Sequence, residues 1–236
     1  MSTPDLHLDT CFVRNDEGRI VSTREPQGER GPLLIIVRGM TSRAWAVRAD
    51  LPSRLASEID RIAQSEPPGS DLREAPVHAE RYISLLKNQI VSGQTPAVKL
   101  SQSDGPAFLF PDSLPSSGNT VVIEDERLLE HSFRGWVPGE IAAGRSPVLA
   151  IVEDNHPVSV CFCARRSQSA AEAGVETAEL YRGRGYGGRV TTAWAEAIRK
   201  SGRIPLYSTL WSNSASLAVA RTLGLMAYAS SWSLNE

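Results

Sequence analysis

The chain has 236 residues, of which 41% are hydrophobic and 22% charged, with a formal net charge of -2 and a pI near 6.1. These values are ordinary for a globular protein, and the chain is long enough to bury a core as one large domain or two small ones. A slightly acidic chain has no global basic field, so we expect no nucleic-acid partner. No apolar run approaches the roughly eighteen residues of a membrane span, so we expect no membrane partner either.

Two features indicate a cytoplasmic protein. The first ten residues, MSTPDLHLDT, have neither the basic n-region nor the apolar h-region of a secretory signal. The three cysteines do not suggest a disulfide framework or a zinc site, because Cys161 and Cys163 are two apart on one predicted strand and Cys11 is distant in sequence. We therefore expect no bound metal.

The first half of the chain alternates strand and helix patterns. The predicted elements are a hairpin over 11–24, a buried strand over 33–37 and amphipathic helices over about 51–64 and 77–88. Residues 101–119 are rich in Ser, Gly, Pro and Asp around a short apolar island, which indicates a junction between domains.

The second half has a denser pattern of short elements. The predicted order is a strand over 120–125, a helix over 126–136, a hairpin over 148–166, a strand over 171–178, a helix after 186, a strand over 205–211, a helix after Asn213 and a last strand over 227–234. His131 is predicted to be a surface residue, Trp194 a core residue, and Cys161 and Cys163 small residues of a strand.

The segment YRGRGYGGR, residues 181–189, carries the strongest chemical signal. Glycines at 183, 185, 187 and 188 let the main chain adopt positive φ and bring amide N–H groups close to phosphate oxygens. The following helix start directs further N–H groups at the same point, and Arg182 and Arg184 add positive charge. No Lys follows as in a Walker loop, and no acidic residue stands about twenty positions later as in a dinucleotide fold.

Residues Arg182–Gly187, RGRGYG, satisfy the pattern Arg/Gln-x-x-Gly-x-Gly/Ala and resemble the acyl-CoA pyrophosphate loop of the GNAT (GCN5-related) N-acetyltransferase superfamily. The order of the surrounding elements extends the resemblance from about Thr120 to the C-terminus. It implies an α/β fold with a GNAT-like mixed central sheet flanked by helices, preceded by a smaller α/β N-terminal region. We accordingly predict an N-terminal α/β domain of unknown role over 1–115 and an acyl-CoA-binding domain over 116–236.

The resemblance implies that acetyl-CoA, or another acyl-CoA, lies between two parallel strands that splay apart. Main-chain atoms near Val175 and Thr177 would bond the pantetheine arm. The amides of Gly183 to Gly188 would hold the diphosphate, with Arg182, Arg184 and Tyr186 beside it. Asn213 corresponds to a position that often contacts the cofactor, but Asn is also among the best residues to cap a helix, and one side chain can do both.

The resemblance also implies direct acyl transfer, in which an acceptor amine loses a proton and a CoA thiolate gains one. Glu172 and Glu176 are the candidate bases, with solvated strand carboxylates as the alternative interpretation. The tyrosine that often serves as the acid is replaced here by Ala220. Tyr207, Ser208 or water remain as proton donors, or else the domain binds acyl-CoA without turnover.

Two functions stay open at this point. The first is an N-acyltransferase that acts on a small amine or amino-acid-like acceptor, and the second is a non-catalytic acyl-CoA-binding or regulatory module. Many GNAT proteins have two strands after the last helix, and this sequence shows only one. The missing strand is predicted to be absent or to come from elsewhere, including a partner chain, so a homodimer is possible.

Overall fold

The computed structural model describes residues 3–92, 99–133 and 135–236. Its strands are β1 (Phe12–Arg14), β2 (Ile20–Thr23), β3 (Leu34–Gly39), β4 (Arg43–Val47), β5 (Ser101–Leu109), β6 (Val121–Val122), β7 (Leu149–Glu153), β8 (His156–Arg166), β9 (Ala170–Thr177), β10 (Ile204–Ser208) and β11 (Met226–Asn235). Its α-helices are α1 (Thr3–Cys11), α2 (Ser53–Ala63), α3 (Ala79–Ser92), α4 (Arg127–Ser132), α5 (Tyr186–Lys200) and α6 (Ser214–Thr222). A π-helical turn, η1, spans Ile141–Arg145, and a 3-10 turn, η2, spans Glu179–Tyr181.

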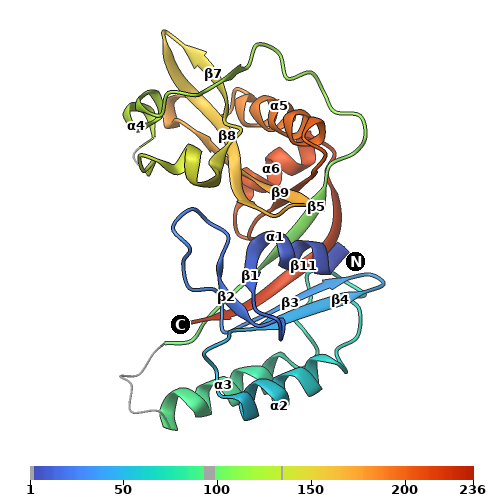
Figure 1. The fold of residues 1–236 in the computed structure, drawn as a ribbon. Helices are drawn as coiled ribbons and strands as arrows, with labels where there is room; N and C mark the ends of the chain where they lie inside the picture. Colours follow the sequence, from blue (N-terminus) through green and yellow to red (C-terminus); the bar gives the residue numbers. More distant parts are fainter. Residues whose placement is uncertain (1–2, 93–98, 134) are drawn as a thin grey trace.

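Nine of these strands form one mixed sheet in the order β4-β3-β11-β5-β10-β9-β8-β7-β6, while β1 and β2 form a separate hairpin. Among the described strand pairs of the large sheet, only β9 and β10 run parallel. The long strands β5 and β11 lie side by side and run from one lobe of the molecule into the other (Figure 1). We call the part with α1 to α3 and β1 to β4 the N-terminal lobe, and the part with α4 to α6 and β6 to β10 the C-terminal lobe.

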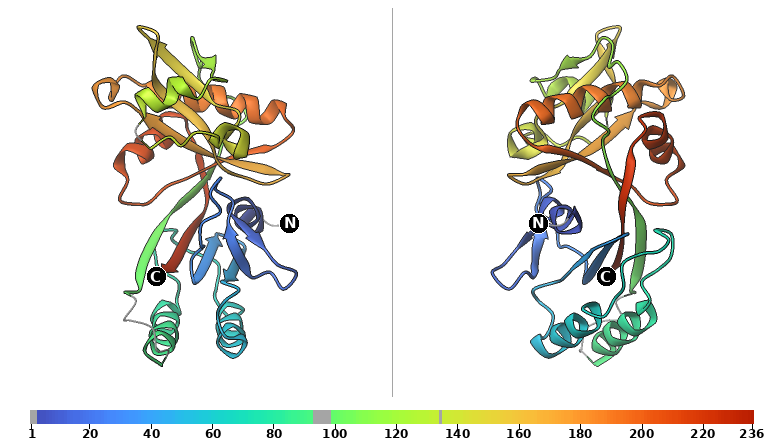
Figure 2. Two further views of the ribbon diagram at one scale, coloured as in Figure 1. Left: turned by 60° about the vertical axis from the view of Figure 1, so that its left-hand side comes forward. Right: turned by 90° about the vertical axis from the view of Figure 1, so that its right-hand side faces the viewer.

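Helices cover both faces of the sheet (Figure 2). On one face of the C-terminal lobe, α5 packs through Val190, Trp194 and Ile198 onto a cluster that includes the strand residues Cys161 and Cys163. On the other face, α4 and the segment after it pack against β7 and β8. In the N-terminal lobe, α2 and α3 cover β3 and the end of β11, and α1 covers the opposite face. The apolar residues that the sequence places at period 3.6 or 2 therefore form the core.

Most predicted elements are confirmed, namely the 11–24 hairpin, the buried strand at Leu34–Gly39, helices α2 and α3, the β7–β8 hairpin, β9, α5, α6 and β11. Trp194, Cys161 and Cys163 are buried and His131 is exposed, as predicted. Three elements end earlier, or are shorter, than expected. The first strand of the C-terminal lobe is only Val121–Val122, the next helix ends at Ser132, and β10 ends at Ser208.

Three helices or strands were missed, namely α1, β4 and β5. Helix α1 was not predicted, although Pro4 in the first helical turn and Asp5 after it are typical of a helix start. The predicted junction over 101–119 is wrong in its first part, because Ser101–Leu109 is a central strand of the sheet. Pro106 misled the prediction, since proline is normally confined to edges and bulges. Here it lies beside the register shift of β11 between Ala227 and Ala229.

Strand β5 also answers the question of the missing strand. It lies between β10 and β11 and is antiparallel to both, so the same chain provides it from the first half. The mixed sheet flanked by helices confirms the predicted fold class. Strands from before and after position 115 belong to the same sheet. The domain boundary proposed at that position stays a prediction.

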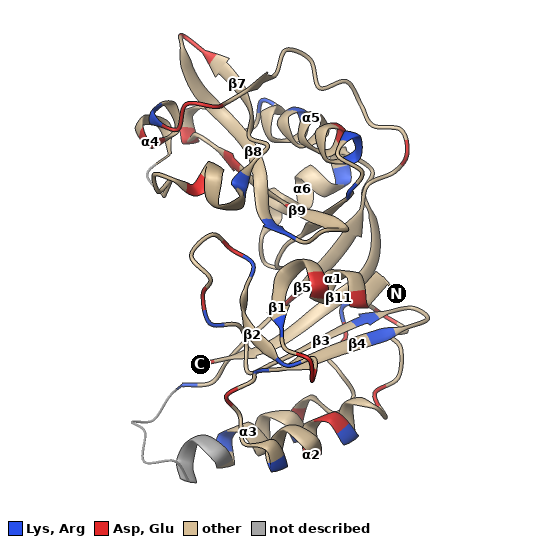
Figure 3. Ribbon diagram, in the orientation of Figure 1, with Lys and Arg blue, Asp and Glu red and all other residues tan. Residues whose placement is uncertain are grey.

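Two surface properties of the described residues complete the fold. None of their helices is long and apolar enough to cross a membrane. Lysine and arginine are interspersed with aspartate and glutamate along both lobes (Figure 3).

Candidate functional site

The parallel strands β9 and β10 separate partway along their length. They pair at three positions, the last being Leu206 opposite Glu172. Strand β9 continues to Thr177 while paired only with β8. Beyond Glu172 the two strands therefore open into a V, as the resemblance to the GNAT superfamily implies.

The main chain of Val175 and Thr177 faces this opening. Ile204 N donates to Ser169 O across the β9–β10 side, and Ala178 N donates to Val158 O on the β8 side. Since successive residues of a strand direct their N–H and C=O groups to alternate sides, odd-numbered residues of β9 face the gap. Arg182 Nε donates to Thr177 O at 3.2 Å, which occupies one of these groups from within the chain.

The glycine-rich loop connects β9 to α5 through η2. Gly183 and Gly185 each have φ of +78°, a left-handed conformation that favours glycine. Gly187 and Gly188 lie inside the first turn of α5 and pack near Val219 and Leu223, so they serve close helix packing rather than positive φ. The sequence argument for positive φ is thus right at two of the four positions.

This loop presents main-chain donors to solvent. Residues 182–185 are exposed, and α5 begins at Tyr186 with Gly185 as its N-terminal flanking residue. Within the described residues, no backbone acceptor is found for the amides of Gly183, Arg184 and Gly185. Together with the unpaired N–H groups at the start of α5, they form a surface suited to an anion.

The side chains around the loop are held by local contacts. The Arg184 guanidinium lies 4.9 Å from the Tyr181 ring centre and donates to Leu180 O at 3.3 Å. Tyr186 directs its hydroxyl at the carboxylate of Glu153 at the end of β7. Neither Arg182 nor Arg184 forms an ion pair in the part of the chain that the structure describes, so both charges are free to meet a diphosphate.

Asn213 is the N-cap of α6, because its Oδ1 accepts a hydrogen bond from Ser216 N at 3.0 Å. It also lines a cavity of about 510 Å³. The capping interpretation is therefore confirmed, and contact with a ligand stays a prediction.

That cavity lies where the two lobes meet the apex of the V. The C-terminal lobe contributes Glu172, Ala173 and Ser208, and the N-terminal lobe contributes residues of α1 and of the segment after β2. Its charged lining residues are Glu25, Glu29, Arg30, Arg165 and Glu172. The cavity is open to solvent and adjoins both splayed strands.

Glu172 is the buried charge of this cavity, with 3% of its surface exposed. It accepts hydrogen bonds from Arg165 at 2.9 Å, from the Cys11 thiol at 3.6 Å and from the Ser208 hydroxyl. Arg165 in turn pairs with Glu25 at 2.7 Å. Burial raises the pKa of Glu172, but the charge of Arg165 and these donors outweigh it, so the net pKa is lowered. Glu172 is consequently ionised at neutral pH.

A chain of polar groups from α1 continues behind Glu172. His7 Nε2 lies 3.7 Å from Cys11 Sγ, and His7 Nδ1 lies 2.9 Å from the Tyr228 hydroxyl. With neutral His7 carrying its proton on Nε2, every donor in the series points toward Glu172. Burial is the largest cause of the lowered pKa of His7 and of the raised pKa values of Cys11 and Tyr228. His7, Cys11 and Tyr228 are therefore neutral, and Glu172 carries the negative charge of this series of groups.

Glu176 differs from Glu172, which lies four positions earlier on β9. The register with β8 is regular from Ala173 to Thr177 and shifts between Ala173 and Glu172. Glu176 is exposed and does not line the cavity. Desolvation raises its pKa, and the charge of Arg182 partly offsets the rise. The structure thus brings Glu172, but not Glu176, to the cavity.

Position 220, where the resemblance places a tyrosine as the general acid, holds an alanine that packs in the core. Ala220 is 2% exposed and belongs to the core between α5 and α6. Tyr207 is also buried, with its hydroxyl 3.4 Å from Ser216 O at the start of α6, and burial raises its pKa. Ser208 is directed at Glu172 and lies on the cavity side.

Sequence reasoning missed His7, Cys11, Glu25, Arg165 and Tyr228. Helix α1 would have been found from Thr3-Pro4-Asp5, but nothing local indicates that it lies against β9, more than 150 positions away in sequence.

Comparisons with known proteins agree with this fold. Residues 148–230 match the family model described as GNAT acetyltransferase. No curated protein matches the chain. A protein of unknown function from Staphylococcus epidermidis ATCC 12228 has 11% identity and a TM-score of 0.51, with 99% of this chain and 96% of that chain covered. At this identity the likeness shows the fold alone.

Two further solved structures are similar. A GNAT-family protein from Novosphingobium aromaticivorans DSM 12444 has 19% identity and a TM-score of 0.49, covering 59% of this chain and 68% of that chain. A GCN5-related N-acetyltransferase-like protein from Streptococcus suis 89/1591 has 17% identity and a TM-score of 0.47, covering 87% and 85%.

The fold and the site define an α/β protein with splayed parallel strands and a glycine-rich loop, between strand and helix, whose exposed main-chain amides suit an anion. The segment that carries these features, residues 148–230, is the one that matches the GNAT acetyltransferase family model. A match to this family implies acyl transfer that depends on an acyl-CoA.

Proposed function

We propose that this protein is an N-acyltransferase that transfers an acyl group, in the first place acetyl, from coenzyme A to a small amine or amino-acid-like acceptor. The observation that carries the proposal is the 182–188 loop, exposed over residues 182–185, at the mouth of the β9–β10 opening and next to a cavity that holds an ionised carboxylate. The loop and the helix start bind the diphosphate, and the main-chain groups of Val175 and the N–H of Thr177 bind the pantetheine arm.

The acceptor enters the cavity between the lobes. The negative charge of Glu172 attracts a protonated amine, and its carboxylate accepts a hydrogen bond from one of the amine N–H groups. Arg165 and Ser208 hold the carboxylate in place. Glu29 adds a second carboxylate to the cavity lining. This set of groups favours a cationic, amine-bearing acceptor.

The reaction is a direct displacement. The deprotonated amine nitrogen attacks the thioester carbonyl carbon, the new C–N bond forms, and the C–S bond breaks to release CoA thiolate. One amine proton leaves to Glu172, Glu176 or water before attack, and a second reaches the thiolate. Because the pKa of Glu172 is lowered, it is a weak proton acceptor, and its larger contribution is to orient the amine.

The test is to mix the purified protein with acetyl-CoA and a panel of amines and to measure release of free thiol. We expect turnover with at least one small amine. Arg182→Glu should reduce it strongly, because the substitution places a negative charge beside the diphosphate. Arg221→Glu makes the same charge change at an exposed position of α6 and is the matched control.

Ala220 is buried and has no proton to donate, so this position provides no general acid. Its absence there favours a second candidate, a non-catalytic acyl-CoA-binding module. The same assay separates the two functions. Tight binding of CoA with no thiol release above background for every amine would support the module, whereas turnover that depends on Glu172 would exclude it.

A further inference from the structure

A second cavity, of about 310 Å³, lies at the opposite end of α5 from the glycine loop. Ala197, Ile198 and Ser201 at the C-terminal end of α5 line it, together with Cys163 of β8 and Ala171 of β9. Helix α5 has 15 residues and is therefore roughly 22 Å long, so this cavity is remote from residues 182–188.

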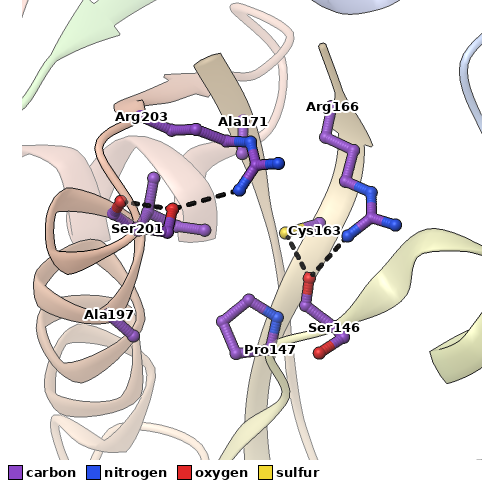
Figure 4. A pocket seen from close by; sticks show the side chains of 9 residues that line it. Ser146, Pro147, Cys163, Arg166, Ala171, Ala197, Ser201 and Arg203 are labelled. Carbon is purple, nitrogen blue, oxygen red and sulfur yellow. Dashed lines mark hydrogen bonds between the residues drawn. The ribbon is translucent and has the colours of Figure 1, made fainter. Parts of the chain in front are cut away.

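Two arginine side chains point into the same opening, one from each side. Figure 4 shows Arg203 on the side of α5 and Arg166 on the end of β8, with Cys163 between them. Arg203 donates to Ser201 Oγ and to Ser167 O, both at 3.2 Å, and Arg166 reaches Ser146 O at 3.5 Å. These contacts orient the guanidinium groups without neutralising them.

No carboxylate compensates the two charges. Among the residues that the structure describes, none of the lining residues is acidic, and neither Arg166 nor Arg203 takes part in an ion pair. The neighbouring Arg145 is different, since it pairs with Glu140 at 3.3 Å. Two like charges directed at one cavity repel each other unless an anion lies between them.

The floor of the cavity is apolar. Ala171, Ile198 and Pro147 line it, and the Cys163 thiol donates to Ser146 O at 3.1 Å, so its proton is already used. Burial raises the pKa of Cys163 to about 11, which keeps the thiol neutral at physiological pH. A ligand that fits has an anionic end for the two arginines and a short hydrocarbon part for the floor.

We propose that this cavity binds a small organic anion, a carboxylate or phosphate with a short apolar group, at a site separate from the acyl-CoA site. Arg166 and Arg203 bind the anionic end from opposite sides. Arginine suits this role because its planar donor groups match the oxygens of carboxylate and phosphate.

The test is a two-dimensional NMR titration of the full chain with butyrate, inorganic phosphate and, as a probe of opposite charge, butylammonium. We expect the amide signals of Ser201 to Arg203 to shift saturably with both anions and not with butylammonium. Arg166→Gln and Arg203→Gln should each weaken the anions by about tenfold. Arg221→Gln, an exposed arginine on α6, is the matched control.

The glycine loop is a competing anion site, so two variants separate the sites. Arg182→Gln should weaken coenzyme A and leave butyrate unchanged, and Arg203→Gln should do the reverse. Shifts confined to residues 183–188, no saturable shift at all, or binding that survives Arg166→Gln and Arg203→Gln together would overturn the proposal. If coenzyme A does not bind, the proposed function fails but this proposal is still tested, because butyrate binding is measured without coenzyme A.

Discussion

At the scale of single residues, two backbone positions and one carboxylate decide the candidate site. Gly183 and Gly185 place the loop amides outward through positive φ, and both have open space where a Cβ would stand. Glu172 concentrates one negative charge at the apex of the V and is held by three donors. The loop was predictable because its chemistry is local, whereas the partners of Glu172 come from distant parts of the chain.

The first prediction concerns Gly185→Ala. A residue with a Cβ disfavours φ near +78°, so the amides should turn and coenzyme A should bind about tenfold more weakly, corresponding to about 1–2 kcal/mol of left-handed strain. Isothermal titration calorimetry measures this. Gly202→Ala is the control, since Gly202 has φ of +80° and equally open space but lies at the other end of α5. Equal loss of affinity in both variants would refute the role of the loop.

The second prediction concerns Glu172 and pH. Its pKa is lowered in the folded state from a usual value of 4.5, so its stabilising effect is complete above that pH and is lost as pH falls through the folded-state pKa. Glu172→Gln should therefore lower the free energy of unfolding at pH 7 by up to about 3 kcal/mol. The loss is smaller than for a cation left without any partner, because Arg165 retains its ion pair with Glu25. The difference from the wild-type chain should shrink below pH 4.5.

Urea unfolding at pH 7 and in acid measures this effect. Glu176→Gln is the matched control, because that side chain is exposed and its removal should change stability by no more than about 0.5 kcal/mol. A Glu172→Gln effect that is independent of pH would show that the ion pair does not stabilise the fold.

At the scale of elements, β5 joins the two lobes. It pairs with β10 on one side and with β11 on the other, and Trp211 N and Thr209 N donate to its carbonyl oxygens at Asp104 and Pro106. The segment that leads to the Asn213 cap is thus fixed by a strand from the first half of the chain. The sequence concealed β5 because its glycine, proline and serine content is typical of a loop.

The third prediction tests this contact through Gly105→Ala. A Cβ at this position would stand 1.8 Å from Thr209 O, and a backbone atom cannot move away as a flexible side chain can. We expect a loss of about 1–3 kcal/mol or more in the free energy of unfolding, together with weaker coenzyme A binding as the Asn213 segment shifts. Thermal unfolding and calorimetry measure the two effects, with Gly135→Ala as the control, because the φ of Gly135 is not positive and no atom lies within 4 Å of a Cβ placed there. Unchanged stability would contradict the close approach.

At the scale of the whole molecule, the lobes depend on each other. The sheet runs without a break from β4 to β6, and the cavity at Glu172 needs α1 and the segment after β2. Three helices of the N-terminal lobe cover strands that include β11, the last strand of the chain. The first half therefore completes both the sheet and the site.

The fourth prediction follows for a fragment of residues 116–236. It lacks β5 and β3, so β10 and both edges of β11 would expose unpaired main-chain groups. We expect it to show no cooperative thermal unfolding by circular dichroism and no binding of coenzyme A. A fragment that unfolds cooperatively and binds coenzyme A would show instead that the domain boundary near 115 is real.

By itself the sequence determined the parts whose physics is local. The periodic apolar residues specified most helices and strands, and the glycines and arginines of 182–188 specified an anion-binding turn at a helix start. Only the tertiary structure decided that Ser101–Leu109 fills the sheet and that Cys11 and Arg165 surround Glu172. Contacts between residues so far apart depend on the packing of the whole sheet, and no local pattern records them.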